Sequence, residues 1–276
     1  MAYLLELSSD LLPLLGLLLG AGAVIGVLAG LFGIGGGAIS VPVFYQVFGN
    51  LGFDDSVRMP LAVGTSLAVI IPTSFVSARA HLARGTVDTG LLRLWALPVL
   101  LGVILGALVA RVADPWVFKL VFVLVAALNA AKLLLGGNGW RLRDGLPGPW
   151  PLRAYGAVTG LLSALMGIGG GAITNLILTL HGVSIHRAVS TGAGAGVLIA
   201  LPATLGYVYA GWGKPGLPLD ATGYVSWLTV AATIPTTLLT TRWGVALAHR
   251  LSRRALETAF GVFLLLVAAR FLLDLL

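Results

Sequence analysis

Residues 33–39 read Gly-Ile-Gly-Gly-Gly-Ala-Ile, and residues 167–173 repeat the same seven residues in the same order. We call these stretches the first and second glycine motifs. A small hydroxyl residue follows each copy, Ser40 after the first and Thr174 after the second. Three consecutive glycines weaken an α-helix more than close helix packing requires. The motifs therefore predict a duplicated chain in which a helix is broken once in each half.

The composition is that of a membrane protein. The chain has 276 residues, of which 58% are hydrophobic and 10% charged. Soluble domains are about 45–50% apolar and about 25% charged, so a soluble globular protein and a disordered chain are excluded. Apolar runs close to the roughly 20 residues that cross a bilayer recur along the whole length. We therefore expect an all-α polytopic membrane protein with the lipid bilayer as its partner.

Several kinds of site are excluded by the same composition. The chain has no Cys, which removes disulfides, thiolate metal ligands and cysteine nucleophiles. The 17 Lys and Arg residues are spread singly between apolar runs and form no basic face, which argues against nucleic-acid binding. We expect no cofactor, no metal site and no catalytic residues.

Breaks at Gly, Pro and charged residues divide the chain into ten apolar segments. A polar stretch at 137–151 is the one plausible linker, and it separates a first membrane repeat (1–136) from a second (152–276). The predicted segments are 11–31, 36–49, 60–79, 91–110 and 116–136 in the first repeat, and 152–165, 171–182, 189–211, 223–243 and 255–274 in the second.

The loop charges predict the orientation. If each segment reverses direction, twelve of the 17 Lys and Arg residues fall on one side of the membrane and five on the other. The positive-inside rule then places the linker in the cytoplasm and both termini outside the cell membrane. Five segments per repeat is an odd number, so the repeats enter the membrane from opposite faces. We predict two inverted-topology repeats, a plan common among secondary transporters.

The segments that follow the glycine motifs are short. At about 1.5 Å per residue, 36–49 and 171–182 reach roughly 18–21 Å, less than the bilayer core of about 30 Å. Broken or re-entrant helices, with a glycine motif at each tip, would explain this length. The sequence leaves two counts open, which are ten full spans or six spans with two re-entrant hairpins.

We predict an oxyanion site near the bilayer midplane, between the two glycine motifs. Free N–H groups at a helix start and the helix dipole suit an anion, and neutral hydroxyl and amide groups add donors without burying a charge. The alternative is that the glycines only pack helices, as we expect for the GxxxG spacing of Gly26 and Gly30. The candidate substrate-binding residues are Gly33, Gly35, Gly36, Gly37, Ser40, Thr65, Ser66, Gly167, Gly169, Gly170, Gly171, Thr174, Asn175 and Thr191.

The charged residues lie toward the ends of the segments. All ten acidic residues fall in loops or near segment ends, so the sequence shows no mid-membrane carboxylate for proton coupling. Arg79, His81 and Arg187 lie near predicted cytoplasmic ends and are candidates for anion access, although ordinary interfacial chemistry and the positive-inside bias explain them as well. Arg270 and Asp274 are one helical turn apart and are expected to pair.

A second repeated stretch carries a family resemblance. The stretch Ala62-Val63-Gly64-Thr65-Ser66-Leu67, with His81 and Gly85-x-Val87-Asp88 downstream, resembles the TauE/SafE family of sulfite exporters, as do the glycine motifs. The resemblance covers about residues 15–274 and includes the echo at Ala188–Thr191 (Ala-Val-Ser-Thr). It implies a permease for small sulfur-containing anions such as sulfite, thiosulfate or organosulfonates. The residues by themselves indicate only a small anion.

Other functions stay open at this point. A passive anion channel cannot be separated from a secondary transporter by sequence. An intramembrane enzyme is the weaker alternative, because the chain has no His-Glu-x-x-His, no Gly-x-Ser-Gly and no paired mid-membrane aspartates. A homo-oligomer is compatible with the sequence, which fixes neither the direction of transport nor its energy coupling.

Overall fold

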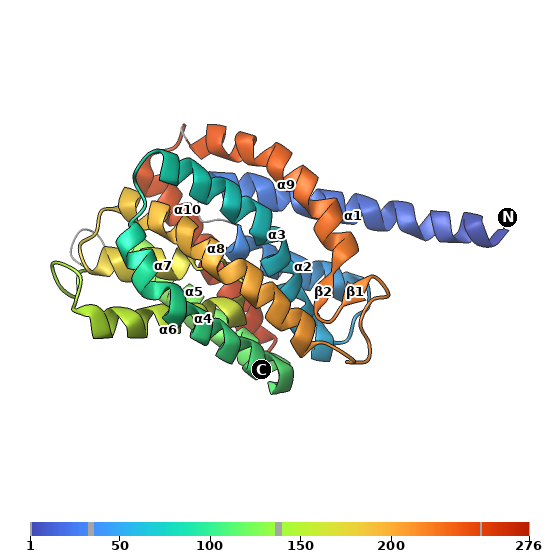
Figure 1. The fold of residues 1–276 in the computed structure, drawn as a ribbon. Coiled ribbons are helices and arrows are strands. Elements are labelled where there is room, and N and C mark those ends of the chain that lie inside the picture. Colours follow the sequence, from blue (N-terminus) through green and yellow to red (C-terminus); the bar gives the residue numbers. More distant parts are fainter. Residues whose placement is uncertain (1, 33–35, 136–139, 249, 276) are drawn as a thin grey trace.

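The computed structural model describes residues 2–32, 36–135, 140–248 and 250–275, and helices dominate them (Figure 1). Each predicted segment overlaps one helix, and the helices confirm an all-α polytopic membrane protein. The small addition is an antiparallel hairpin of two-residue strands. The elements are α1 (Ala2–Phe32), α2 (Gly37–Asn50), α3 (Asp55–Ala83), α4 (Thr89–Val112), α5 (Pro115–Leu135), α6 (Pro149–Met166), α7 (Gly171–Leu180), α8 (Ile185–Ala210), β1 (Ala221–Thr222), β2 (Val225–Ser226), α9 (Trp227–Ala248) and α10 (Arg253–Leu273).

Within the described residues, six helices are long and apolar enough to cross a membrane. They are α1 from Pro13 onward, α3, α4, α5, α8 and α10. The two helices that follow the glycine motifs are shorter, with 14 residues in α2 and 10 in α7. At about 1.5 Å per residue neither spans a bilayer core of about 30 Å, as the sequence predicts.

The helix is interrupted at both glycine motifs, which confirms the predicted breaks. In the second motif, α6 ends before Gly167 (φ +67°) and α7 begins after Gly170 (φ +74°). In the first, α1 ends at Phe32 and α2 begins after Gly36 (φ +79°), whereas residues 33–35 lie outside the described part of the chain. These positive φ angles lie in the left-handed region, where glycine lacks the strain of other residues. The glycines therefore allow the chain to leave one helix and start another.

Helices from the two halves of the chain pack on one another rather than forming two separate bodies. The pairs in extensive contact are α1 with α9, α4 with α6, α3 with α8, and α5 with α10. In Figure 1, α1 and α9 run side by side although some 200 residues separate them in the sequence. Every one of these pairs joins a helix of the first half to a helix of the second. The interior of the protein is thus built jointly by both halves.

Small residues bring the paired helices together. Gly26 and Gly30 of α1 lie against backbone atoms of Thr237 and Thr241 on α9, where an added Cβ would clash. The Thr237 hydroxyl also donates to the carbonyl oxygen of Gly22 at 3.0 Å. The prediction that Gly26 and Gly30 pack helices is therefore confirmed. Small residues and interhelical hydroxyl bonds are the usual means of joining helices in lipid, which offers little hydrophobic driving force between them.

Candidate functional site

The two glycine motifs meet in the interior. A Cβ built on Gly37, the first residue of α2, would lie 2.8 Å from Ile168 Cα and 2.9 Å from the Gly167 carbonyl oxygen. No side chain fits there without moving the backbone of the second motif. The Ser66 hydroxyl of α3 donates to that same Gly167 oxygen at 2.8 Å. Residues of the first half therefore support the helix break of the second.

A small cavity lies where α7 begins, and we call it the inner cavity. Its volume is about 70 Å³. Close approach of α8 to the broken chain forms one wall, because an added Cβ on Gly196 would lie 2.9 Å from the Gly169 carbonyl oxygen and one on Gly192 would lie 3.1 Å from Gly171 Cα. The lining residues are Ile70, Thr73, Ser74, Ser77 and His81 of α3, Gly169, Gly171 and Asn175 of the second motif and α7, and Val189, Gly192, Ala193 and Gly196 of α8.

The start of α7 supplies polar groups to this cavity. Gly170 occupies the N-cap position and offers no side chain to the first N–H groups of the helix. Such groups have no acceptor within their own helix, and the helix dipole adds roughly half a positive charge at this end. One turn on, Asn175 Oδ1 is buried and has no hydrogen-bond partner among the described residues. A buried acceptor without a partner is uncommon and points to a missing hydrogen-bond donor such as a water, whereas the Asn175 amide nitrogen is the group of this side chain that can donate.

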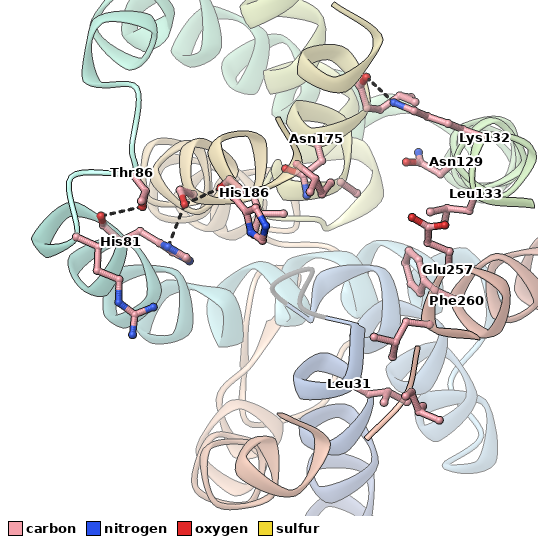
Figure 2. A pocket seen from close by; sticks show the side chains of 18 residues that line it. Leu31, His81, Thr86, Asn129, Lys132, Leu133, Asn175, His186, Glu257 and Phe260 are labelled. Carbon is pink, nitrogen blue, oxygen red and sulfur yellow. Dashed lines mark hydrogen bonds between the residues drawn. The ribbon is translucent and has the colours of Figure 1, made fainter. Parts of the chain in front are cut away.

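A larger cavity of about 790 Å³, which we call the vestibule, lies next to the inner cavity (Figure 2). His81, Asn175 and Val189 line both. Its other polar lining includes Arg84, Thr86, Asn129, Lys132, His186, Ser190 and Glu257. The lining therefore holds two basic side chains, Arg84 and Lys132, against one carboxylate, and a net positive wall attracts anions.

His81 lies at the boundary between the two cavities. Its Nδ1 is 3.1 Å from the Ser190 hydroxyl oxygen, and Ser190 also donates to the His186 carbonyl oxygen at 2.8 Å. On the other side of the vestibule, Lys132 Nζ donates to the Leu176 carbonyl oxygen at 3.3 Å and to the Thr179 hydroxyl, near the C-terminal end of α7. Of the predicted access residues, His81 is therefore the one that lines the two cavities.

The other two predicted access residues lie elsewhere. The guanidinium of Arg187 pairs with Asp88 at 3.0 Å, and its side chain is 60% exposed. Arg79 lines a separate groove on the outer surface of α3, α4 and α8. The sequence prediction missed Thr73, Ser74 and Ser77, although these residues and His81 recur along one face of α3 at helical spacing. That spacing was a usable signal.

The predicted glycines and hydroxyl residues divide into two groups. Gly169, Gly171 and Asn175 line the inner cavity, whereas Gly36, Gly37, Gly167 and Gly170 shape the breaks beside it. The hydroxyls of Ser40 and Ser66 donate to backbone carbonyl oxygens, and those of Thr65 and Thr191 accept from backbone N–H groups. Thr174 is fully buried, and its hydroxyl has no partner among the described residues. Gly33 and Gly35 lie outside the described residues.

Thr65 and Thr191 make matching bonds across the two halves. Thr65 Oγ1 of α3 accepts from the N–H of Ser226, just before α9, at 3.2 Å, and Thr191 Oγ1 of α8 accepts from the N–H of Asp88, just before α4, at 3.0 Å. Each turn that donates the N–H group begins with a glycine of positive φ, in Gly85-Thr86-Val87-Asp88 and in Gly223-Tyr224-Val225-Ser226. The sequence prediction did not identify this second pair of repeated turns, which the Gly-x-Val spacing could have revealed.

The opposite end of α3 is held by a polar cluster that we call the outer cluster. Asp55 accepts from Tyr45 at 2.7 Å, from Arg58 at 2.9 Å and from Lys119 at 2.8 Å. The Arg58 guanidinium also lies 3.9 Å from the centre of the Tyr45 ring. Lys119 is only 3% exposed, so its charge depends on this carboxylate. The cluster ties α2, α3 and α5 together about 26 residues of helix away from His81, which corresponds to about 39 Å.

Comparison with known proteins identifies relatives of this chain. The family model described as "Sulfite exporter TauE/SafE" matches residues 18–271. A probable membrane transporter protein of Haemophilus influenzae is 30% identical over 90% of this chain and 94% of its own length. One of Methanocaldococcus jannaschii is 30% identical over 75% of this chain and 77% of its own, and one of Bacillus subtilis, named YunE, is 24% identical over 92% and 95%.

No solved structure matches the chain. The family match covers most of the residues, and the relatives align along nearly the same length. The family and its relatives are named as membrane transporters, which agrees with a function other than catalysis. This chain belongs to the TauE/SafE sulfite exporter family.

Proposed function

We propose that the protein is a secondary transporter of small sulfur-containing anions, which bind in the inner cavity at the start of α7. The observation that carries the proposal is the position of this cavity. It lies at a helix break between the halves, is lined by the Asn175 amide, and adjoins a basic vestibule. A transporter needs such a site at membrane depth with a path to one side.

The lining of the inner cavity favours an anion of small size. Helix N–H groups, the Asn175 amide and the Ser77 hydroxyl are neutral donors, which bind an anion without burying an opposing fixed charge, whereas the Ser74 hydroxyl donates to the Ile71 carbonyl oxygen. A buried water needs about 10–15 Å³ of such space, so a volume of about 70 Å³ holds roughly five waters or one small oxyanion. The family's description as sulfite exporters makes sulfite, thiosulfate and organosulfonates the first compounds to test.

We further propose that the halves are inverted-topology repeats in the cell membrane, with both termini outside. The exchanged helix pairs support this arrangement, because α1 packs on α9 as α6 packs on α4. The reciprocal bonds of Thr65 and Thr191 support it independently. On this view the vestibule opens to the cytoplasm and the outer cluster closes the opposite side. Ser40, Thr65, Ser66 and the first glycine motif would then approach substrate when the outer side opens.

Counterflow in liposomes tests the proposed function. Purified protein is reconstituted with unlabelled sulfite, thiosulfate or an alkyl sulfonate inside, and uptake of the same labelled anion is followed. With the membrane potential clamped by valinomycin and equal potassium on both sides, a transporter accumulates label transiently by exchange, whereas a channel gives rapid flux without accumulation. We expect counterflow with at least one anion of the panel. Folded protein that fails with all of them would contradict the substrate class.

Two variants locate the site in the same assay. Asn175→Leu removes the amide that lines both cavities, and we expect counterflow to be lost. Thr159→Val is the matched control, because the Thr159 hydroxyl is equally buried and unpartnered but lies outside both linings. We expect this control to retain the activity of the parent. Equal activity in both variants would place the substrate elsewhere.

A further inference from the structure

A groove on the outer surface of the helix bundle is separate from both cavities of the transport path. It has a volume of about 530 Å³ and runs between α3, α4 and α8. Its walls are apolar, and among them Phe75 is 60% and Leu82 50% exposed. In a chain whose α3, α4 and α8 are long and apolar enough to cross a membrane, such side chains face lipid tails. The groove therefore has the volume and chemistry to hold a hydrocarbon chain.

Two arginines stand at one end of this apolar groove. Arg79 is four residues before the end of α3, and Arg93 is four residues after the start of α4. Each therefore lies about 6 Å inside its helix end, close to the turn that joins the two helices. Both side chains are exposed, and among the described residues neither has a hydrogen-bond or ion-pair partner. Thr89, the first residue of α4, lines the same groove and carries a hydroxyl group.

We propose that this groove binds an anionic phospholipid, with an acyl chain along α3, α4 and α8 and the phosphate between Arg79 and Arg93. The positive charge at the end of the groove is the reason for choosing an anionic lipid as its occupant. Two guanidinium groups at headgroup depth favour a phosphate as their partner. The apolar floor of the groove favours an acyl chain over water or a polar peptide. The loop charges predict that this end is cytoplasmic, and anionic lipids are concentrated in the cytoplasmic leaflet. A basic pocket between membrane helices on that side is a recognised arrangement for anionic headgroups.

This site differs from the proposed anion site in its chemistry and its place. Arg79 and Arg93 lie outside the linings of the vestibule and the inner cavity. The lipid is bound from the side, through the bilayer, whereas the transported anion reaches its cavity through the vestibule. Binding of a lipid at this groove is therefore independent of the identity of the transported anion.

Native mass spectrometry of the full chain tests this proposal with two lipids that share acyl chains and differ in headgroup charge. The probes are dioleoyl phosphatidylglycerol and dioleoyl phosphatidylcholine. We expect the parent to retain the first more strongly than the second. Each arginine near a membrane surface contributes about a fivefold preference for an anionic lipid, so Arg79→Gln combined with Arg93→Gln should lower the preference about 30-fold. Equal retention by this double variant and the parent would overturn the proposal.

The controls distinguish the contribution of the lipid headgroup from that of the acyl chain, and both from other occupants of the groove. Arg242→Gln is matched, because Arg242 is also exposed, lies six residues before the end of α9 and is outside the groove; it should leave the preference unchanged. Ala96→Phe keeps both arginines, fills the groove and should also weaken retention of phosphatidylglycerol. Unchanged retention of phosphatidylglycerol by Ala96→Phe would mean that the acyl chain lies outside the groove, and this result would contradict the proposed site. Inorganic phosphate should not compete with the lipid. If the variants lose a dimer and keep their lipid adducts, the groove binds a second copy of the protein and not a lipid.

Discussion

Gly37→Ala probes the place where the two glycine motifs meet. The added methyl group would lie 2.8 Å from Ile168 Cα and 2.9 Å from the Gly167 carbonyl oxygen. Both neighbours are backbone atoms, so the chain of the second motif must move rather than a flexible side chain. Overpacking of this kind costs about 1–3 kcal/mol. Because Gly167 also accepts the bond from Ser66, we expect the shift to disturb the second helix break as well.

The assay is thermal unfolding of purified protein in detergent, with Gly16→Ala as the matched control. Gly16 is also helical, and an added Cβ there has no atom within 4 Å. Alanine should make this control equally stable or more stable, by up to about 1 kcal/mol. At about 2–4 °C per kcal/mol, Gly37→Ala should lower Tm by roughly 2–12 °C. A Gly37→Ala protein that melts with the parent and keeps its counterflow would refute the close meeting of the two motifs.

Three further substitutions test other parts of the structure by the same unfolding assay. Gly170→Ala places a side chain in the left-handed region at φ +74° and should cost about 1–2 kcal/mol; no loss of stability would mean that the α7 start is not left-handed. Thr65→Val and Thr191→Val each leave a backbone N–H of the other half without its acceptor, so both should lose about 1–3 kcal/mol, and a neutral result in either would contradict the matching bonds. Asp55→Asn should cost about 3–5 kcal/mol because Lys119 is then a buried charge without a counterion, and a loss below about 1 kcal/mol would show that the outer cluster is open to water.

The positions of the helices along the chain could largely be predicted from apolar runs and glycine breaks. The predicted segment 116–136 lies within one residue of α5, and 255–274 lies close to α10. The boundaries of α3 are poorer, because the sequence places it at 60–79 and the structure extends it to Asp55–Ala83. Charged residues ended the predicted segment, but Asp55 and Arg58 are paired in the outer cluster and so remain helical. Tertiary partners, which the sequence does not display, decide such ends.

The candidate site could be predicted only in part. The helix-starting glycines and Asn175 were identifiable because an anion site needs a broken helix and neutral donors. Ser40, Thr65 and Thr191 have the same chemistry, yet each is occupied by a backbone hydrogen bond. A hydroxyl group in an apolar segment can form a hydrogen bond either to a ligand or to the backbone. Only its neighbours in space distinguish the two roles. Arg270 and Asp274, which are neighbours in one helix, do pair as predicted, at 3.1 Å.

The most direct test of the account is equilibrium binding of the anion that gives counterflow. Binding to purified parent, Asn175→Leu and Thr159→Val is measured by isothermal titration. A hydrogen bond to a charged partner contributes about 1.5–3 kcal/mol, so Asn175→Leu should weaken binding by about 10-fold to 150-fold. Thr159→Val should bind like the parent. Parent-like affinity in a folded Asn175→Leu protein would contradict an anion site at the start of α7.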